Sequence, residues 1–296
     1  MKKIINVITL LLTSATLMFA QLTIEISDNM QVETTGGVYI SGAVDVIENG
    51  SGYLKGVVES SSLSGATQFA GLTFGSGYSG TITRTTGTAL SAATPKTFLR
   101  SYKLVSGSVL NTSLNSKYIS TGANDEDNNI GTPFIYKKVG AAWTGYSNNT
   151  TSPNVASAAS VSIPNGTSEF TISEGIGVAA RIFLEGPYST GTMSTSIHGL
   201  IPAASPYTEA PRTASAIPAN AVDWVLVSLR NTTSPFAVVA SHSAFVKNNG
   251  MIIDDNGNEF TGVPASAPGT YKISVKHRNH LAVMTNTNPS LTWASN

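Results

Sequence analysis

Apolar residues in this chain alternate with polar ones at a period of two, and almost no segment repeats them every three or four positions. In Tyr271–Lys276, apolar side chains occupy every second position and polar ones fill the gaps, which predicts a half-buried β-strand. Segment Trp224–Leu229 is apolar on both faces, so we expect a central strand there. The pattern predicts an all-β fold.

Turn signals suggest how the strands are connected. Asn249-Gly250 and Asn256-Gly257 are dipeptides suited to two-residue hairpins, and strand-length segments in the C-terminal part are separated by turn signals every ten or so residues. This spacing is typical of an antiparallel β-sandwich of the immunoglobulin-like type. We also expect turns at 60–65 and 75–80, which are rich in Ser and Gly, and a long loop over 199–220.

The N-terminal part has a tighter rhythm. Very short strand candidates lie about seven residues apart between Leu22 and Ile47. This pitch is typical of a β-roll or of the first coils of a solenoid, in which each strand stacks on an earlier one. An ordinary meander explains the same pattern, and both interpretations stay open.

The first twenty residues predict export. Lys2 and Lys3 precede an apolar segment from Ile4 to Phe19, and Ala20 is a small residue at the expected cleavage position. This is the layout of a secretory signal peptide, and it is too short and too interrupted for a membrane span. We therefore expect a secreted protein or one on the outer cell surface.

We predict four segments in the chain. They are a signal peptide over 1–20, a β-rich region of short stacked strands over 21–95, a middle β-rich segment over 96–178 with a linker near 148–160, and a C-terminal sandwich over 179–296. The linker is predicted because 148–160 is rich in small and polar residues, with little to bury.

Composition excludes several classes of protein. The chain has no cysteine, which excludes a disulfide framework, thiolate nucleophiles and cysteine-bound metals. Lys+Arg and Asp+Glu both number 17 and no basic stretch stands out, so we expect no nucleic-acid partner. No later run approaches the roughly 20 apolar residues of a membrane helix, so we expect no membrane span in the mature chain.

Two oxygen-rich segments are candidate calcium sites. Asp254, Asn256 and Asn258 place side-chain oxygens at alternating positions around a glycine turn, and Asp125 and Asp127 lie in a second acidic patch. Hard cations such as Ca²⁺ bind oxygen ligands of this kind. Neither segment has the full spacing of a helix-flanked calcium loop, and a solvated turn explains both. Beyond Ca²⁺ we expect no cofactor.

Aromatic residues near loops are candidates for ligand binding. Trp143, Tyr146 and Tyr188 lie near loops, and flat rings on a β face can stack on sugars. The alternative is core and interface packing, in which Trp and Tyr bury large areas while a polar tip stays hydrated.

His277 and His280 form an H-x-x-H motif after the last predicted strand. Residues three apart on a regular strand face opposite sides, so the pair could share a metal only across a bulge or turn. The structural interpretation is a hydrogen-bonded His277 at the edge of the core. For catalysis, no Gly-x-Ser-x-Gly motif is present, and Asp223 is one of several carboxylates that nothing in the sequence pairs.

Several C-terminal segments resemble a module of secreted, multidomain surface proteins from Bacteroidota and related bacteria. The segments are 181–188, 193–195, 200–202, 206–207, 222–230 and 277–284. The middle part of the chain is similar to a β-rich segment that often precedes this module. The resemblance implies export by the type IX secretion route but no established activity. Such proteins usually continue into a C-terminal sorting domain, so we expect this sequence to be a fragment or a truncated gene product.

Together these observations predict a non-catalytic secreted or cell-surface protein with a structural, adhesive or display role. Its partners would be extracellular polysaccharides or other surface proteins. A carbohydrate-binding module of a larger secreted protein is the first alternative. An extracellular hydrolase is the second.

Overall fold

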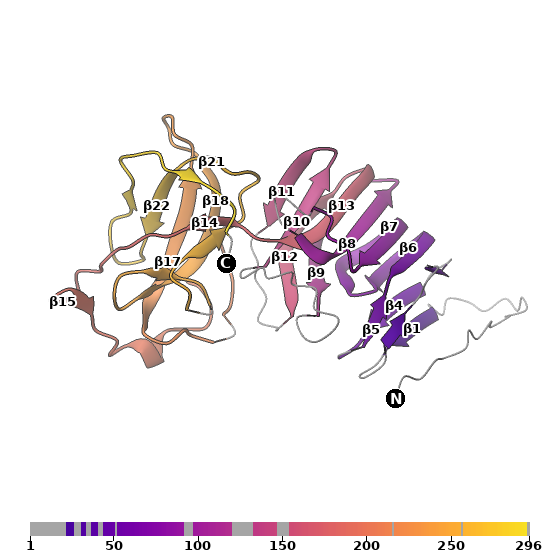
Figure 1. The fold of residues 1–296 in the computed structure, drawn as a ribbon, viewed down its shortest axis with the longest axis horizontal. Coiled ribbons are helices and arrows are strands. Elements are labelled where there is room, and N and C mark those ends of the chain that lie inside the picture. The colour runs from indigo at the N-terminus through magenta and orange to yellow at the C-terminus, as the bar shows by residue number, and fades with distance from the viewer. Residues whose placement is uncertain are drawn as a thin grey trace, which may run out of the picture.

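The computed structural model consists of strands joined by turns and loops, and Figure 1 shows two β-rich units side by side. The structure describes residues 22–26, 31–33, 37–40, 44–50, 52–91, 97–119, 133–146, 154–214, 216–255 and 257–294. Within these ranges there is no α-helix, only a short 3-10 helix at His198–Leu200, so the predicted all-β fold is confirmed. No helix in these ranges has the length and apolar character needed to cross a bilayer. The predicted signal peptide lies outside them.

The six N-terminal strands form two coils that stack in parallel. They are β1 (Leu22–Ile26), β2 (Gln31–Glu33), β3 (Val38–Ile40), β4 (Val44–Glu48), β5 (Tyr53–Lys55) and β6 (Val57–Phe69). Strand β1 pairs with β4, β2 with β5, and β3 with β6, all in parallel. A meander would pair successive strands antiparallel. The observed pairing is therefore that of one coil stacked on another.

The other strands of the first unit extend the same sheet. They are β7 (Leu72–Thr86), β8 (Thr97–Ser106), β9 (Leu110–Lys117), β10 (Phe134–Val139), β11 (Ala142–Tyr146), β12 (Val155–Ile163) and β13 (Gly166–Ser173). The order runs β1-β4-β6-β7-β8-β13-β10-β11, and β12 joins through β9. The predicted boundary between 95 and 96 separates β7 from β8, which are hydrogen-bonded neighbours. Residues on both sides of that boundary therefore form one unit.

Strand β7 turns the sheet around a corner. Its residues 80–86 pair with β8, whereas residues 72–74 pair with β9. Register shifts along β6 mark the accompanying bends. The folded sheet encloses an apolar core that includes Phe69, Tyr78 and Leu104. The turns predicted at 60–65 and 75–80 are wrong, because both segments lie inside strands that their glycines bend but do not end.

The linker prediction is wrong from residue 155 onward. Strand β12 occupies Val155–Ile163 and pairs with β9, while 148–153 lies outside the described residues. Ala156, Ala158 and Val161 are buried in the first core. Small side chains suffice there because the neighbouring strands bring the surrounding apolar surface, which composition alone does not reveal.

The second unit is built on a five-stranded antiparallel sheet of order β19-β18-β17-β22-β23. These strands are β17 (Ala221–Arg230), β18 (Val238–Lys247), β19 (Ile252–Ile253), β22 (Lys272–Lys276) and β23 (Val283–Met284). Strand β17 is central and buried on both faces, as its sequence predicts. The shorter strands are β14 (Ile176–Val178), β15 (Tyr188–Ser189), β16 (Thr192–Met193), β20 (Thr261–Val263), β21 (Gly269–Thr270) and β24 (Ser290–Leu291).

Each face of the five-stranded sheet is covered differently. On one face Val225, Val227 and Leu229 pack into a second core together with residues of β14 and β20. On the other face Trp224 and Leu226 form a third core with the long loop that precedes β17. That loop is anchored to the sheet, because the Trp224 Nε1 donates to the carbonyl oxygen of Pro202 at 2.8 Å.

The two units share part of their apolar interior. Phe134 and Tyr136 of β10 belong to the second core although their strand belongs to the first sheet, and both are fully buried. The Tyr136 hydroxyl donates to the carbonyl oxygen of Ala265 at 3.0 Å. In Figure 1, β10 and β11 accordingly lie at the side of the first unit that faces the second.

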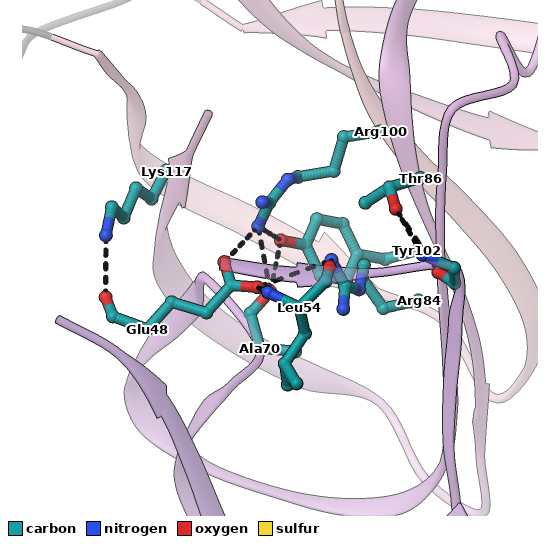
Figure 2. Close-up of polar contacts among 9 residues, drawn as sticks. Glu48, Leu54, Ala70, Arg84, Thr86, Arg100, Tyr102 and Lys117 are labelled. Atoms are coloured by element: carbon teal, nitrogen blue, oxygen red, sulfur yellow. Dashed lines mark hydrogen bonds and ion pairs between the residues drawn. The ribbon is translucent and has the colours of Figure 1, made fainter. Parts of the chain in front are cut away.

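A buried ionic cluster ties the second coil to the antiparallel sheet (Figure 2). The Glu48 carboxylate accepts from Arg100 Nη1 at 2.7 Å and lies 3.4 Å from Arg84 Nη1. The backbone amide of Leu54 also donates to this carboxylate, at 2.9 Å. Burial acts to raise the pKa of Glu48, but Arg100, Arg84 and the Leu54 amide hold it below its usual value. Because the cluster is enclosed, its role is structural.

Candidate functional site

The aromatic residues predicted to bind ligand do not meet. Trp143 and Tyr146 lie three residues apart on β11, so they face opposite sides of the sheet. Trp143 packs against the second core and Tyr146 against the first. Tyr188 lies elsewhere, on β15, where its ring contacts Phe183 with centroids 5.1 Å apart. These three residues therefore do not form one stacking face.

In the first candidate calcium site, the described residues Asp254 and Asn258 are hydrogen-bonded to each other across a turn. Asp254 is buried, and its two carboxylate oxygens accept from the backbone amide and the side-chain amide of Asn258, each at 2.9 Å. Asn256, Asp125 and Asp127 lie outside the described residues. Within the described ranges no group of three or more His, Cys, Asp or Glu is arranged to hold a metal ion.

The H-x-x-H motif forms a chain of polar contacts with a carboxylate. Strand β22 ends at Lys276, and the turn that follows brings His277 Nδ1 within 2.8 Å of His280 Nδ1. On its other side, His277 Nε2 lies 3.2 Å from Asp223 Oδ2, which also accepts from Arg278 at 2.8 Å. His277 is buried at the edge of the core, as the structural interpretation of the motif predicts.

When both imidazoles are neutral, the hydrogen bonds determine which ring nitrogen of each histidine carries the proton. A carboxylate only accepts, so His277 Nε2 carries a proton and its Nδ1 is an acceptor. His280 Nδ1 must then donate to His277, which leaves His280 Nε2 as the basic end of the chain. Burial acts to raise the pKa of Asp223, but hydrogen bonds from His277, the Trp224 amide and Arg278 hold it below its usual value.

This arrangement resembles the acid–base half of a catalytic triad, with an oriented imidazole backed by a carboxylate. Among the described contacts, neither imidazole bonds a serine or threonine hydroxyl that could act as a nucleophile. The sequence motif identified the two histidines. Asp223 is 54 residues from His277 in the chain, and no sequence signal links them.

A second polar site, which the sequence reasoning missed, lies on the five-stranded sheet. Ser228 of β17 lies opposite Ser241 of β18 on one side and opposite Ser274 of β22 on the other. Side chains alternate along β17, so Ser228 faces the side of Leu226, away from the second core. The Ser228 and Ser241 hydroxyl oxygens are 2.8 Å apart. The result is a row of hydroxyl groups across three strands.

The serine row forms part of a groove of about 520 Å³. Small side chains leave the middle of this face hollow, and longer ones border it. The lining includes Leu226, Arg230, Lys276 and Glu209 besides the serine row. Its volume lies within the roughly 300–1,000 Å³ of small-molecule sites. We call this site the serine groove.

Charged side chains in the serine groove are held in place. Arg230 Nε donates to Ser274 Oγ at 2.8 Å, and Arg230 Nη1 donates to the carbonyl oxygen of Phe236 at 3.1 Å. Lys276 Nζ forms an ion pair with Glu209 at 2.7 Å. This hydrogen bond from Lys276 lowers the pKa of Glu209. The groove is therefore polar, with oriented donors.

Searches against protein-family models, curated proteins and solved structures return no match to this chain.

Proposed function

We propose that this chain is a non-catalytic, exported β-rich protein with a structural, adhesive or display role at the outer cell surface. The observation that carries the proposal is the core shared by the two units, in which Phe134 and Tyr136 of one sheet are buried in the other unit. A large apolar junction suppresses relative motion of units. A rigid body of this kind holds its exposed loops and grooves in fixed relative positions, which suits presentation to a partner.

Retention on a surface tests this proposal. The purified protein is incubated with insoluble polysaccharides and with protein-coated beads, and bound protein and released soluble products are both measured. We expect retention on at least one surface without release of products. The proposal is contradicted if no surface retains the protein, or if the pure protein releases soluble products.

A carbohydrate-binding module is the alternative that the serine groove favours. Hydroxyl rows and a fixed guanidinium supply the directional hydrogen bonds that orient polar ligands in pockets. Under this alternative, retention is confined to polysaccharide and is competed by soluble oligosaccharides of the same composition. Retention on protein-coated beads alone argues against it.

An extracellular hydrolase is the alternative that the Asp223–His277–His280 chain favours. Any hydrolytic activity that depends on this chain should fall by about a hundredfold or more in His280→Gln, since general acid–base groups contribute roughly 10²–10⁴-fold. His198→Gln is the matched control, because His198 lies apart and contacts the carbonyl oxygen of Pro218. Equal activity in both variants argues against this site as the source of turnover.

We also propose export directed by residues 1–20, by the type IX route that the resemblance implies. The layout of this segment supports export: Leu11 lies in the middle of its apolar stretch. Residues 1–40 fused to an enzyme reporter that is active only outside the cytoplasm should give reporter activity. Leu11→Arg should abolish that activity by interrupting the apolar stretch, whereas Gln21→Arg, beyond it, should not. Activity that survives Leu11→Arg contradicts the proposal.

A further inference from the structure

The serine groove carries one positive charge that no carboxylate in the described part of the chain compensates. Lys276 is neutralised by Glu209. Arg230 makes hydrogen bonds to a hydroxyl and to a backbone carbonyl, and none of the described ion pairs involves it. A guanidinium has five N–H donors in a rigid fork, and the two bonds occupy only part of that set. Arg230 is therefore oriented by the protein and still has donors for a ligand.

The groups around Arg230 favour a ligand with many hydroxyls. Ser228, Ser241 and Ser274 supply hydroxyl groups that both donate and accept, at neighbouring positions on three strands. Ser228 and Ser274 are nearly buried, so a ligand that reaches them loses its water and must replace those hydrogen bonds. Saccharide hydroxyls match such a row, because each is also both donor and acceptor.

One uncompensated guanidinium favours one carboxylate. A planar carboxylate can accept two parallel N–H bonds from arginine. Phosphate groups carry up to two charges and are usually held by several cations or by backbone amides at a helix N-terminus. Of the two cations in the described lining, Lys276 is paired with Glu209, which leaves Arg230, and the described lining contains no helix.

We propose that the serine groove binds an acidic oligosaccharide, with a uronate carboxylate on Arg230 and sugar hydroxyls on the serine row. This inference rests on the proposed adhesive function and names the class of polymer that the surface would recognise. It places recognition on the five-stranded sheet instead of on Trp143, Tyr146 and Tyr188.

Calorimetric titration with tetragalacturonate tests the assignment. The wild-type protein should bind tetragalacturonate and should bind its fully methyl-esterified form at least about tenfold more weakly, because the ester removes the charge that Arg230 pairs with. Binding should also weaken as salt is raised. Arg230→Gln should lose about tenfold or more in affinity.

Two further variants keep the test decisive. Arg181→Gln is the matched control, because it removes an exposed arginine outside the groove and should bind like wild type. Ser241→Leu fills the groove without changing any charge, so it should abolish binding even if Arg230→Gln proves unstable. Circular dichroism confirms that each variant is folded. Unchanged binding in Arg230→Gln or in Ser241→Leu overturns the assignment.

The outcome also separates this inference from the proposed function. Retention on a surface together with no detectable tetragalacturonate binding by the wild type overturns the groove assignment and leaves the adhesive role intact. Tetragalacturonate binding with the expected variant pattern, but without retention on any surface, supports the groove and contradicts the adhesive role.

Discussion

At the scale of single residues, the Glu48 carboxylate of the first unit is a buried charge that depends on its partners. It lies between two arginines, and all three side chains are almost entirely excluded from solvent (Figure 2). A buried ion pair adds little net stability compared with apolar packing, but removal of one partner leaves uncompensated charge in the interior. The ion pairs of Glu48 therefore add little net stability, but a fold that separated Glu48 from the two arginines would be strongly disfavoured.

Glu48→Gln should lower the free energy of unfolding by about 3–5 kcal/mol, because it removes the negative charge that both buried guanidinium groups contact. Urea denaturation measures the loss. Glu169→Gln is the control: its carboxylate pairs with Lys138 at 3.2 Å in a partly exposed site, and such pairs contribute about 0–1 kcal/mol. Similar losses in both variants would falsify the structural role given to the cluster.

His242 should make stability depend on pH. It is buried on β18 beside Phe134, and its Nδ1 has no hydrogen-bond partner. Burial, assisted by the charge of Arg212, holds the pKa of His242 well below 6.5. The unfolded chain binds a proton near that pH and the folded chain does not. Stability should therefore fall as the pH drops below about 6.5, and is unaffected by this group at higher pH.

Between pH 6.5 and 5.5 the free energy of unfolding should fall by about 1 kcal/mol through His242 alone. His242→Phe should remove that fall, because a phenyl ring packs on Phe134 without taking up a proton. Urea titrations at both pH values measure the difference, and His198→Gln serves as the histidine control. If His242→Phe keeps the wild-type pH dependence, another group is responsible.

At the scale of elements, the bend of β7 determines how the first sheet encloses its core. Gly80 lies where β7 begins to pair with β8, and its φ of 143° is one that side chains rarely adopt. A Cβ atom at this position would lie 2.3 Å from the carbonyl oxygen of Val105. The corner therefore requires glycine for both conformation and space.

Gly80→Ala should destabilise the protein by about 1–3 kcal/mol, from backbone strain and the displaced neighbouring strand. Gly107→Ala should change stability by less than about 0.5 kcal/mol, because a Cβ there meets nothing within 4 Å. Thermal melts of the two variants give the comparison. Equal melting temperatures would show that the corner tolerates a side chain.

At the scale of the whole molecule, the junction between the units controls cooperativity. Tyr136 is fully buried in the core of the second unit, and its hydroxyl bonds the Ala265 carbonyl. Two domains joined only by a linker unfold separately, whereas domains with a shared core unfold together.

Wild-type protein should therefore unfold in a single calorimetric transition. Tyr136→Ala should cost about 3–5 kcal/mol and separate that transition into two. Tyr39→Ala, at a tyrosine that is 74% exposed, should leave the transition unchanged. Two transitions already present in the wild type would mean that the shared core does not couple the units.

The period-two pattern predicted the positions of two strands of the second unit well. The strand over Lys272–Lys276 and the doubly buried β17 both lie where the sequence placed them. The solvated face predicted for Lys272–Lys276 is wrong: Lys272 and Ser274 are buried, and Lys272 donates to the carbonyl oxygens of Thr285 and Asn286. The turns predicted at 60–65 and 75–80 were wrong, because glycine bends these strands without ending them. The linker predicted over β12 was wrong because its small alanine side chains are buried by strands that are distant in the sequence.

The sequence by itself determined that this chain forms strands, because alternation along a strand is a local property of the backbone. Only the tertiary structure decided which strands are neighbours, since that depends on side chains far apart in the chain. Asp223 meets His277 across 54 residues, and the serine row is assembled from three strands. Both polar sites are products of strand register, which no single segment encodes.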